Sequence, residues 1–268
     1  TYFSRARSAG GAIAAMADKG SAVYIVRFTN DEKDSWNLPP EETALSNRQE
    51  SEAAARILGV KEVISMGYRA AEMGDVPFTT VRDRLLFYIR HYRPTVLFLP
   101  NPYTEYDRVL DRYYVGGAAE DAWRAASIEN YLPPFNTMGL LRPHVTPEVY
   151  YYAPPVDPRR KEAETTATFA PQPKVIDIAG TIAKKVKAVQ AMKTINQAMA
   201  MRLKARLEAT GRRLPLLETV NPTTMDKLVE ENVRGLARVA SAGSSYALAE
   251  EFQYAGLAYR IPAKYLKQ

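Results

Sequence analysis

The sequence predicts a Rossmann-like α/β fold, with a mainly parallel, doubly wound sheet and helices on both faces. Short apolar runs typical of buried strands alternate with segments of helical composition, as expected for a parallel sheet that is covered on both faces. The 268 residues, 46% hydrophobic and 25% charged, are enough for one large α/β domain. We therefore expect a single domain over residues 1–268, to which the C-terminal part, about 145–268, adds strands and helices.

The first half of the chain carries three expected strands, each rich in β-branched or aromatic residues. They lie at 21–28, 60–66 and 95–100. We expect these three to share one sheet. Helices are expected before, between and after them, at 10–20, 41–59, 78–92 and 110–126. Gly20 and Gly59 stand where the first two of these helices should end.

The second half is less regular. Strands are expected in "PEVYYYAPP" and "KVIDI", and a strand or extended segment in "YALAEEFQYAGLAYRIP" near the end. Residues 180–210 contain no proline and favour one or two helices. A last helix should begin near Thr223 or Thr224, either of which could act as its N-terminal cap.

Composition excludes several kinds of chemistry. The chain has no cysteine, which rules out disulfides, thiolate catalysis and Cys-ligated zinc. No run of about 18 apolar residues is present, so we expect no membrane span. The N-terminal "TYFSRARSAGG" lacks the apolar core of a signal peptide. We expect a soluble protein, either cytoplasmic or secreted after processing.

Positive charge is concentrated in one stretch of the chain. The net charge is +6, and residues 179–213 hold nine Lys or Arg but one acid, Glu208. This stretch predicts either an anionic partner, such as nucleic acid or a lipid surface, or the solvated face of a long helix. No aromatic residue interleaves with the charges, which argues against nucleic acid.

Two polar loops follow expected strands and should meet at the same rim of the sheet, where open α/β sheets bind ligands. The candidate pocket residues from these loops are Asn30, Asp31, Glu32, Asn101, Tyr106, Asp107, Asp111 and Arg112. The carboxylates of Asp107 and Asp111, with Glu105, could hold a hard cation. Alternatively, the two aspartates cap the following helix and pair with neighbouring arginines. The two histidines, His91 near a helix end and His144 in a Pro-rich loop, are expected to be structural.

Several segments, in the right order along nearly the whole chain, resemble the LmbE/PIG-L family of zinc-dependent de-N-acetylases. They include "GGAIAAMADKGSAVYIVRFTNDE", "NRQESEAAARILGV", "RPTVLFLPNP", "RYYVGGAAEDAWRAA" and "YALAEEF". The resemblance implies a zinc cofactor and an N-acetyl-sugar-like substrate. It also assigns Arg48 to the substrate pocket, because the matching arginine of the family contacts substrate.

The departures from the family pattern fall on its metal motifs. The A-H-P-D-D motif of the family has no match at Thr1 to Ser4, unless it lies upstream of Thr1. The H-P-D-H motif aligns with Val109 to Arg112, so that Asp111 is kept and Arg112 replaces a zinc-binding histidine. A guanidinium cannot ligate zinc. No zinc or other cofactor is therefore supported within this sequence, and we expect Arg112 to pair with a carboxylate of the former metal pocket.

Three functions remain open. The chain could be a family member that has lost its activity and serves as a binding or structural protein, assembling with copies of itself. It could be an active amide hydrolase of an N-acetyl sugar or related substrate, with its metal motif upstream of Thr1. It could also be a basic protein that binds anions through residues 179–213.

Overall fold

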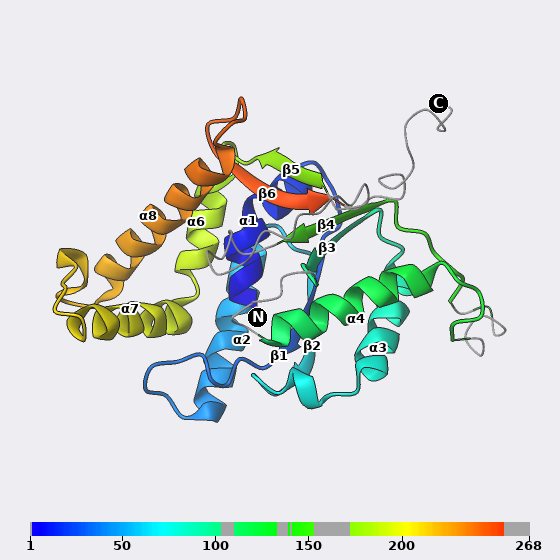
Figure 1. Cartoon of the computed structure of the whole chain (residues 1–268), viewed down its shortest axis with the longest axis horizontal. Helices are drawn as coiled ribbons and strands as arrows, with labels where there is room; N and C mark the ends of the chain where they lie inside the picture. The colour runs from blue at the N-terminus through cyan, green and yellow to red at the C-terminus, as the bar shows by residue number, and fades with distance from the viewer. Residues whose placement is uncertain (1, 103–109, 133–138, 140, 153–171, 255–268) are drawn as a thin grey trace. The chain divides into compact units, whose positions relative to one another are not determined.

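A computed structural model describes the chain except for residues 1, 103–109, 133–138, 140, 153–171 and 255–268 (Figure 1). Helices and strands alternate over the first half, as the sequence predicts, and two pairs of strands are parallel. The α/β class with parallel strands is therefore confirmed. Among the described residues, no helix is both long enough and apolar enough to cross a membrane.

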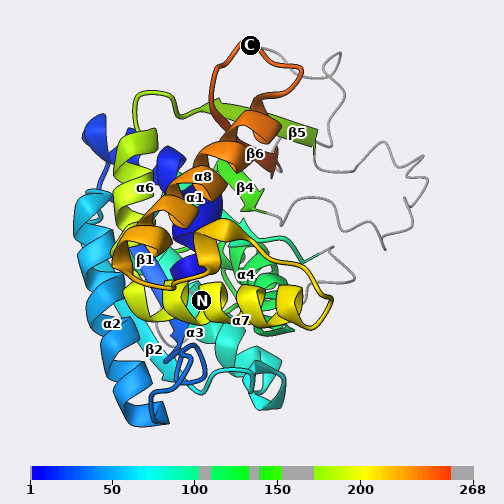
Figure 2. The ribbon, with the colours of Figure 1, turned by 90° about the vertical axis from the view of Figure 1, so that its left-hand side faces the viewer.

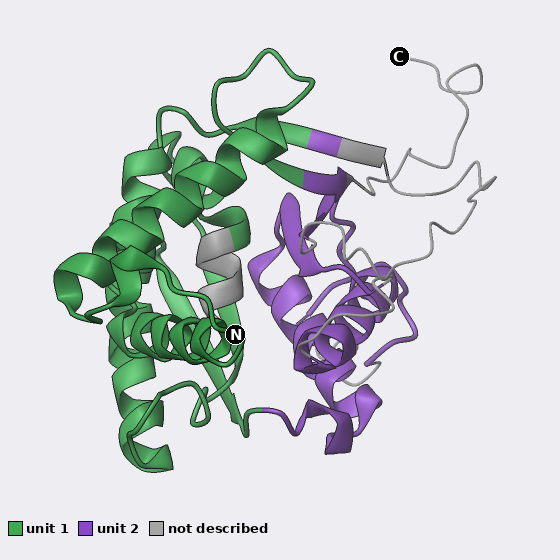
Figure 3. Ribbon diagram, turned by 60° about the vertical axis from the view of Figure 1, so that its left-hand side comes forward, with its two compact units in different colours: residues 1–70, 175–251 green, residues 71–174, 252–268 purple. Residues whose placement is uncertain are grey.

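The described residues divide into two compact units, which Figure 3 distinguishes by colour. Unit 1 comprises residues 1–70 and 175–251, and unit 2 comprises residues 71–174 and 252–268. The expectation of one domain over the whole chain stays a prediction.

Unit 1 contains two parallel strands and most of the helices. Its elements are α1 (Tyr2–Asp18), β1 (Tyr24–Thr29), α2 (Pro40–Ile57), β2 (Glu62–Tyr68), α6 (Ile182–Gln190), α7 (Lys193–Glu208), the 3₁₀ helix η2 (Pro215–Leu217) and α8 (Pro222–Ser241). Strands β1 and β2 pair in register from Tyr24 opposite Glu62, with an irregularity between Arg27 and Thr29. Gly59 follows α2 with a φ of 77°, as expected for a glycine that ends a helix.

Gly10 and Gly11, in the middle of α1, lie where the helix packs closely against its neighbours. A Cβ atom on Gly11 of α1 would lie 2.6 Å from Cγ2 of Ile178, so a larger residue could not fit there. The neighbouring backbone N–H groups of Gly11 and Ala12 donate to the Glu250 carboxylate, each at 2.8 Å. Lys185 of α6 pairs with the same carboxylate at 2.7 Å, and both side chains are buried. This buried ion pair connects α1, α6 and the C-terminal part of unit 1.

Unit 2 is built around strands β3 (Val96–Pro100) and β4 (Glu148–Tyr152), which pair in parallel. Its helices are the 3₁₀ helix η1 (Met73–Asp75), α3 (Phe78–Tyr92) and α4 (Leu110–Ala126). The Phe98 ring stacks on Tyr150 at 5.1 Å and meets Phe252 edge to face at 5.2 Å. These aromatic contacts form part of the core of the unit.

Strands β5 (Gln172–Asp177) and β6 (Ala249–Tyr254) each pass from one unit into the other. They complete a sheet of order β3-β4-β6-β5, in which β6 runs antiparallel to β4. Strands β1 and β2 form a separate hydrogen-bonded sheet. The expectation that 21–28, 60–66 and 95–100 share one sheet is thus wrong for the described residues. An apolar run predicts a strand, but it does not predict which strand becomes its partner.

The cap of α8 also differs from the prediction. Asn221, and neither Thr223 nor Thr224, is the N-terminal cap, and its side chain accepts the backbone N–H of Thr224. The Thr224 hydroxyl in turn accepts the Asn221 backbone N–H, which completes a capping box. Pro222 occupies the first helical position, so the cap lies three residues before Thr224 and two before Thr223.

Candidate functional site

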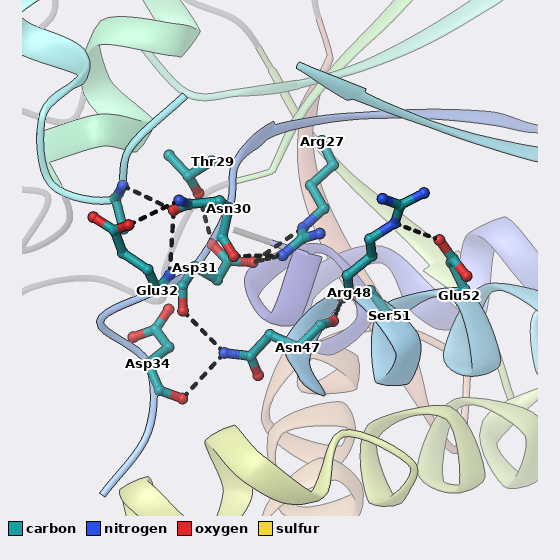
Figure 4. Close-up of polar contacts among 11 residues, drawn as sticks. Arg27, Thr29, Asn30, Asp31, Glu32, Asp34, Asn47, Arg48, Ser51 and Glu52 are labelled. Atoms are coloured by element: carbon teal, nitrogen blue, oxygen red, sulfur yellow. Dashed lines mark hydrogen bonds and ion pairs between the residues drawn. The ribbon is translucent and has the colours of Figure 1, made fainter. Parts of the chain in front are cut away.

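The loop after β1, in unit 1, contains three of the predicted pocket residues and is held by a dense set of hydrogen bonds (Figure 4). Asp31 is buried, and its backbone has a φ of 56°, a conformation that aspartate tolerates better than most residues. One carboxylate oxygen of Asp31 accepts from Arg27, from Nε at 3.2 Å and from Nη2 at 3.1 Å. The other oxygen accepts from the Thr29 hydroxyl at 2.6 Å. Asp31 is therefore neutralised and fixed within its own loop.

Asn47 of helix α2 also holds this loop in place. The Asn47 amide donates to the backbone carbonyls of Asp31, at 2.9 Å, and of Asp34, at 3.3 Å. Arg48, the next residue, pairs with Glu52 on the same helix, and 66% of its side chain is exposed. Figure 4 shows the Arg48 side chain extending toward Glu52, while Asn47 reaches the loop. The substrate role that the resemblance assigns to Arg48 stays a prediction.

Glu32 and Asn30 connect the loop to the segment that follows β2. The Asn30 amide donates to Glu32 at 2.9 Å, and Arg69 Nε donates to the other Glu32 oxygen at 3.0 Å. These bonds, first that from Asn30 and then that from Arg69, lower the pKa of Glu32 below its ordinary value. The Asn30 side-chain oxygen accepts the backbone N–H of Ala70 at 3.3 Å. Glu32 is thus held as a carboxylate first by the Asn30 amide and then by the Arg69 guanidinium.

In unit 2, Asp111 anchors the segment that leads into η1. One of its carboxylate oxygens accepts the backbone N–H of Ala71 at 2.7 Å, and the other accepts that of Met73 at 3.1 Å. Asp111 is buried in the first turn of α4, and Ala71 has a φ of 64°, which is unusual for alanine. The two bonds from the carboxylate hold this strained segment in place. Asp111 therefore acts on a neighbouring loop, which differs from the helix-capping alternative considered for it.

The structure describes only some of the other predicted site residues of unit 2. The Asn101 amide donates to Gln253, and Gly116 of α4 packs so closely on the end of β3 that an added Cβ would lie 2.9 Å from the Pro100 carbonyl oxygen. Tyr106 and Asp107, like Glu105, lie outside the described residues. The predicted pairing of Arg112 with a carboxylate, and the predicted convergence of loops 29–36 and 101–112, stay predictions.

Both histidines take part in structural contacts within unit 2. The His144 ring lies 2.8 Å, through Nε2, from the Pro94 carbonyl oxygen. The His91 ring stacks on Phe87 and meets Tyr92 edge to face. Within the described part of the chain, no three His, Cys, Asp or Glu residues are grouped so that they could hold a metal ion. The donor set that the described residues offer does not fit a catalytic zinc ion, which typically takes three protein ligands.

Sequence reasoning missed Arg27, Asn47 and Arg69, which hold the polar loop of unit 1. Arg27 carries a detectable signal, because a cation in the middle of the buried run "YIVRFT" must find a buried partner. Asn47 and Arg69 carry no comparable signal in a single sequence. Asp31, Glu32 and Asp111 are each occupied as hydrogen-bond acceptors that position loops.

The fold and the loops at strand ends define the chain as an α/β protein with polar loops at the carboxyl ends of its parallel strands, where open sheets bind ligands. Residues 5–112 match the family model described as GlcNAc-PI de-N-acetylase, PIG-L. A diacetylchitobiose deacetylase from Thermococcus kodakarensis is 29% identical over 149 residues, which are 53% of this chain and 53% of that protein. The match thus spans about half the length of that curated relative.

Solved structures share the fold over almost the whole chain. The N,N'-diacetylchitobiose deacetylase of Pyrococcus horikoshii superposes with a TM-score of 0.72 at 21% identity, covering 97% of this chain and 83% of that one. A conserved protein of Thermus thermophilus gives a TM-score of 0.65 at 20% identity, covering 99% and 95%. A 4-carboxy-2-hydroxymuconate hydratase of Pseudomonas putida gives 0.62 at 18% identity, covering 95% and 92%. The similarity to the LmbE/PIG-L family that the sequence predicts is thus confirmed over residues 5–112, and a deacetylase is among the proteins that the chain resembles.

Proposed function

We propose that this chain is a LmbE/PIG-L protein without zinc-dependent de-N-acetylase activity, which serves as a binding or assembly protein. The observation that carries the proposal is the position of the Asp111 carboxylate. Both of its oxygens accept backbone N–H groups, from Ala71 and Met73, so that metal binding would have to compete with these bonds. Breaking them would leave two donors unsatisfied beside a buried residue, which is costly.

The residue that follows Asp111 supports the same conclusion. Arg112 stands where the family resemblance places a zinc-binding histidine. A guanidinium stays protonated at any working pH, has no lone pair to offer a metal, and repels a divalent cation. The loop of unit 1 follows a similar pattern, because Arg27 neutralises Asp31 and Arg69 neutralises Glu32. Arginine thus takes a place beside acids that could otherwise bind a cation.

The ligand that we propose for this protein is an N-acetyl-sugar-like small molecule, with further copies of the chain as the alternative partner. The proposal for the sugar rests on the similarity to the diacetylchitobiose deacetylase. A neutral sugar needs hydrogen-bonding groups fixed in place more than it needs a metal. The cross-linked Asn30 and Glu32 side chains are fixed in this way.

The test is to measure zinc and activity together in the full-length protein, including any residues upstream of Thr1. We expect less than stoichiometric zinc by elemental analysis, and no acetate release from N,N'-diacetylchitobiose. We expect saturation-transfer NMR to detect binding of the same sugar. Arg112→His should raise zinc affinity, whereas Arg108→His, which changes an arginine outside the aligned position, should not. Stoichiometric zinc with acetate release that a chelator abolishes would overturn the proposal.

An active amide hydrolase is the second candidate function. The 29% identity to a curated deacetylase favours it, and it requires a metal motif upstream of Thr1. In that case the wild-type protein would release acetate, and Asp111→Asn would abolish the release while zinc remained bound through the upstream residues. The same zinc and acetate measurements therefore distinguish the two candidates.

A further inference from the structure

Unit 1 contains an apolar groove that is distinct from the polar loop after β1, because no residue of that loop lines it. It has a volume of about 350 Å³ and is lined by eleven side chains from α6, α7 and α8, seven of them apolar. Figure 2 turns α7 and α8 toward the reader and shows them meeting at an angle beside α6. Part of the basic stretch 179–213 lines this groove. The polar loops described above include no residue of that stretch.

Helical spacing explains how the groove is formed. On α8, lining residues occur at Met225, Leu228, Val229 and Val233, three, four and eight positions apart, which places them on one face. Val229 and Val233 are buried and form the floor, while Met225 and Leu228 are less deeply placed. On α7, Leu203 lies at the mouth with 37% of its surface exposed. The groove is therefore open to solvent at one side and apolar and buried at its base.

Two arginines of α7 lie at the edge of this apolar surface. Arg202 and Arg206 are four residues apart and thus neighbours on the helix. Arg202 Nη2 donates to the backbone carbonyls of Lys33, at 3.4 Å, and Ser35, at 3.3 Å, which fix the guanidinium without neutralising it. The nearby acid Glu208 lies 4.0 Å from Lys204. Over the described ranges, no carboxylate forms an ion pair with Arg202 or Arg206.

We propose that this groove binds a single-chain anionic amphiphile of the fatty-acid class. The alkyl chain would lie against Met199, Leu228 and Val229, and the carboxylate would pair with Arg206 and Arg202. Burial of each methylene is favourable, and a guanidinium bonds two carboxylate oxygens at once. The flexible thioether chains of Met199 and Met225 suit an alkyl chain without fixed shape.

The lining argues against other anionic ligands. No aromatic side chain is among the groove residues, so nucleic-acid bases would have no stacking surface. A free phosphate or short anion would use the arginines but leave the apolar floor uncovered. A volume of about 350 Å³ lies at the small end for ligand sites, as suits one narrow chain.

The experiment is calorimetric titration of the full chain with dodecanoate below its micellar concentration. We expect one-to-one binding, no detectable binding of acetate, and weaker binding of a neutral dodecyl maltoside. Arg206→Gln should weaken dodecanoate binding by about tenfold, and Leu228→Asn should weaken it by a similar factor. Arg213→Gln is the matched control, because it removes an equal charge from an exposed arginine of the same basic stretch outside the groove.

Each of the other results would overturn the proposal. Equal weakening by Arg206→Gln and Arg213→Gln would show that only the net charge matters. Acetate that binds as well as dodecanoate would show an anion site without an apolar component. Binding to vesicles that contain phosphatidylglycerol, with none to monomeric dodecanoate, would show a membrane surface and no groove ligand. Circular dichroism melts of each variant establish that a loss of binding is not a loss of folding.

Discussion

Replacing Asp111 by Asn tests whether this residue is a structural anchor or a spare metal ligand. In the structure its two oxygens accept the N–H groups of Ala71 and Met73. The asparagine side-chain oxygen can accept one of these two N–H groups. Its NH₂ group would then face the other N–H group, so that two donors point at each other. One charge-assisted bond is lost and one buried donor is left unsatisfied, so the free energy of unfolding should fall by about 2–4 kcal/mol.

The two tryptophans allow this loss to be assigned to the correct unit. Trp123 lies in unit 2 and donates to the Thr146 carbonyl, whereas Trp36 lies in unit 1 and is 44% exposed. In a Trp36→Phe background, urea unfolding followed by fluorescence reports on Trp123 alone. The matched control is Asp75→Asn, an exposed aspartate of the neighbouring 3₁₀ helix, which should change stability by less than about 0.5 kcal/mol.

An opposite result would refute the anchoring role. Asp111→Asn would then leave the unfolding free energy unchanged or raise it, as is expected when a carboxylate in a cluster of acids loses its repulsive charge. The measurement is made in the presence of a chelator, so that bound metal cannot contribute to the difference. An equal effect of the Asp111 and Asp75 substitutions would refute it as well.

Three further predictions concern unit 1. Glu250→Ala leaves Lys185 buried without its partner and should cost about 3–5 kcal/mol of unfolding free energy in a urea melt, of which Lys185→Met in the same chain should restore part. Burial raises the pKa of Glu50 above its ordinary 4.5. The stability that this group contributes is therefore complete below that pH and is lost as pH rises through the folded-state pKa. Glu50→Gln should remove this pH dependence of the unfolding free energy, and an unchanged dependence on pH would contradict the assignment. Asn47→Ala removes two hydrogen bonds to loop carbonyls and should lower the unfolding free energy by about 1–2 kcal/mol. The control Arg48→Ala breaks an exposed ion pair and should change it by less than about 0.5 kcal/mol. Equal losses in the two variants would show that the loop does not depend on Asn47.

The positions of most helices and strands could be predicted from the sequence, because they depend on local periodicity. The expected helix at 110–126 coincides with α4, and the expected strand at 95–100 differs from β3 by one residue. The division of the strands into two sheets could not be predicted. Pairing depends on which backbone edges meet, and the side chains of β2, several of them exposed, do not encode the choice of partner.

The candidate site was predictable in its location but not in its bonding. The acids Asp31, Glu32 and Asp111 are recognisable because they follow apolar strands. Their partners are distant or belong to the backbone: Arg69 is 37 positions from Glu32, and Ala71 offers only its N–H group to Asp111. Backbone donors leave no trace in residue identity, so a sequence cannot show that a carboxylate is already satisfied.

The Asp111 measurement and the zinc measurement together test the proposed non-catalytic role. A destabilised Asp111→Asn variant in a zinc-free protein means that the aspartate of the second motif serves the fold, because its carboxylate holds Ala71 in a left-handed conformation that alanine otherwise avoids. A destabilised variant in a protein that binds zinc means that one carboxylate serves fold and chemistry at once, with the metal held by other residues. In the first case Arg112→His should gain zinc only weakly, because Asp111 would have to give up two N–H bonds to join the metal. A tight zinc site created by that single substitution would therefore show that the two bonds to Asp111 are easily broken, and it would remove the main support for a non-catalytic role.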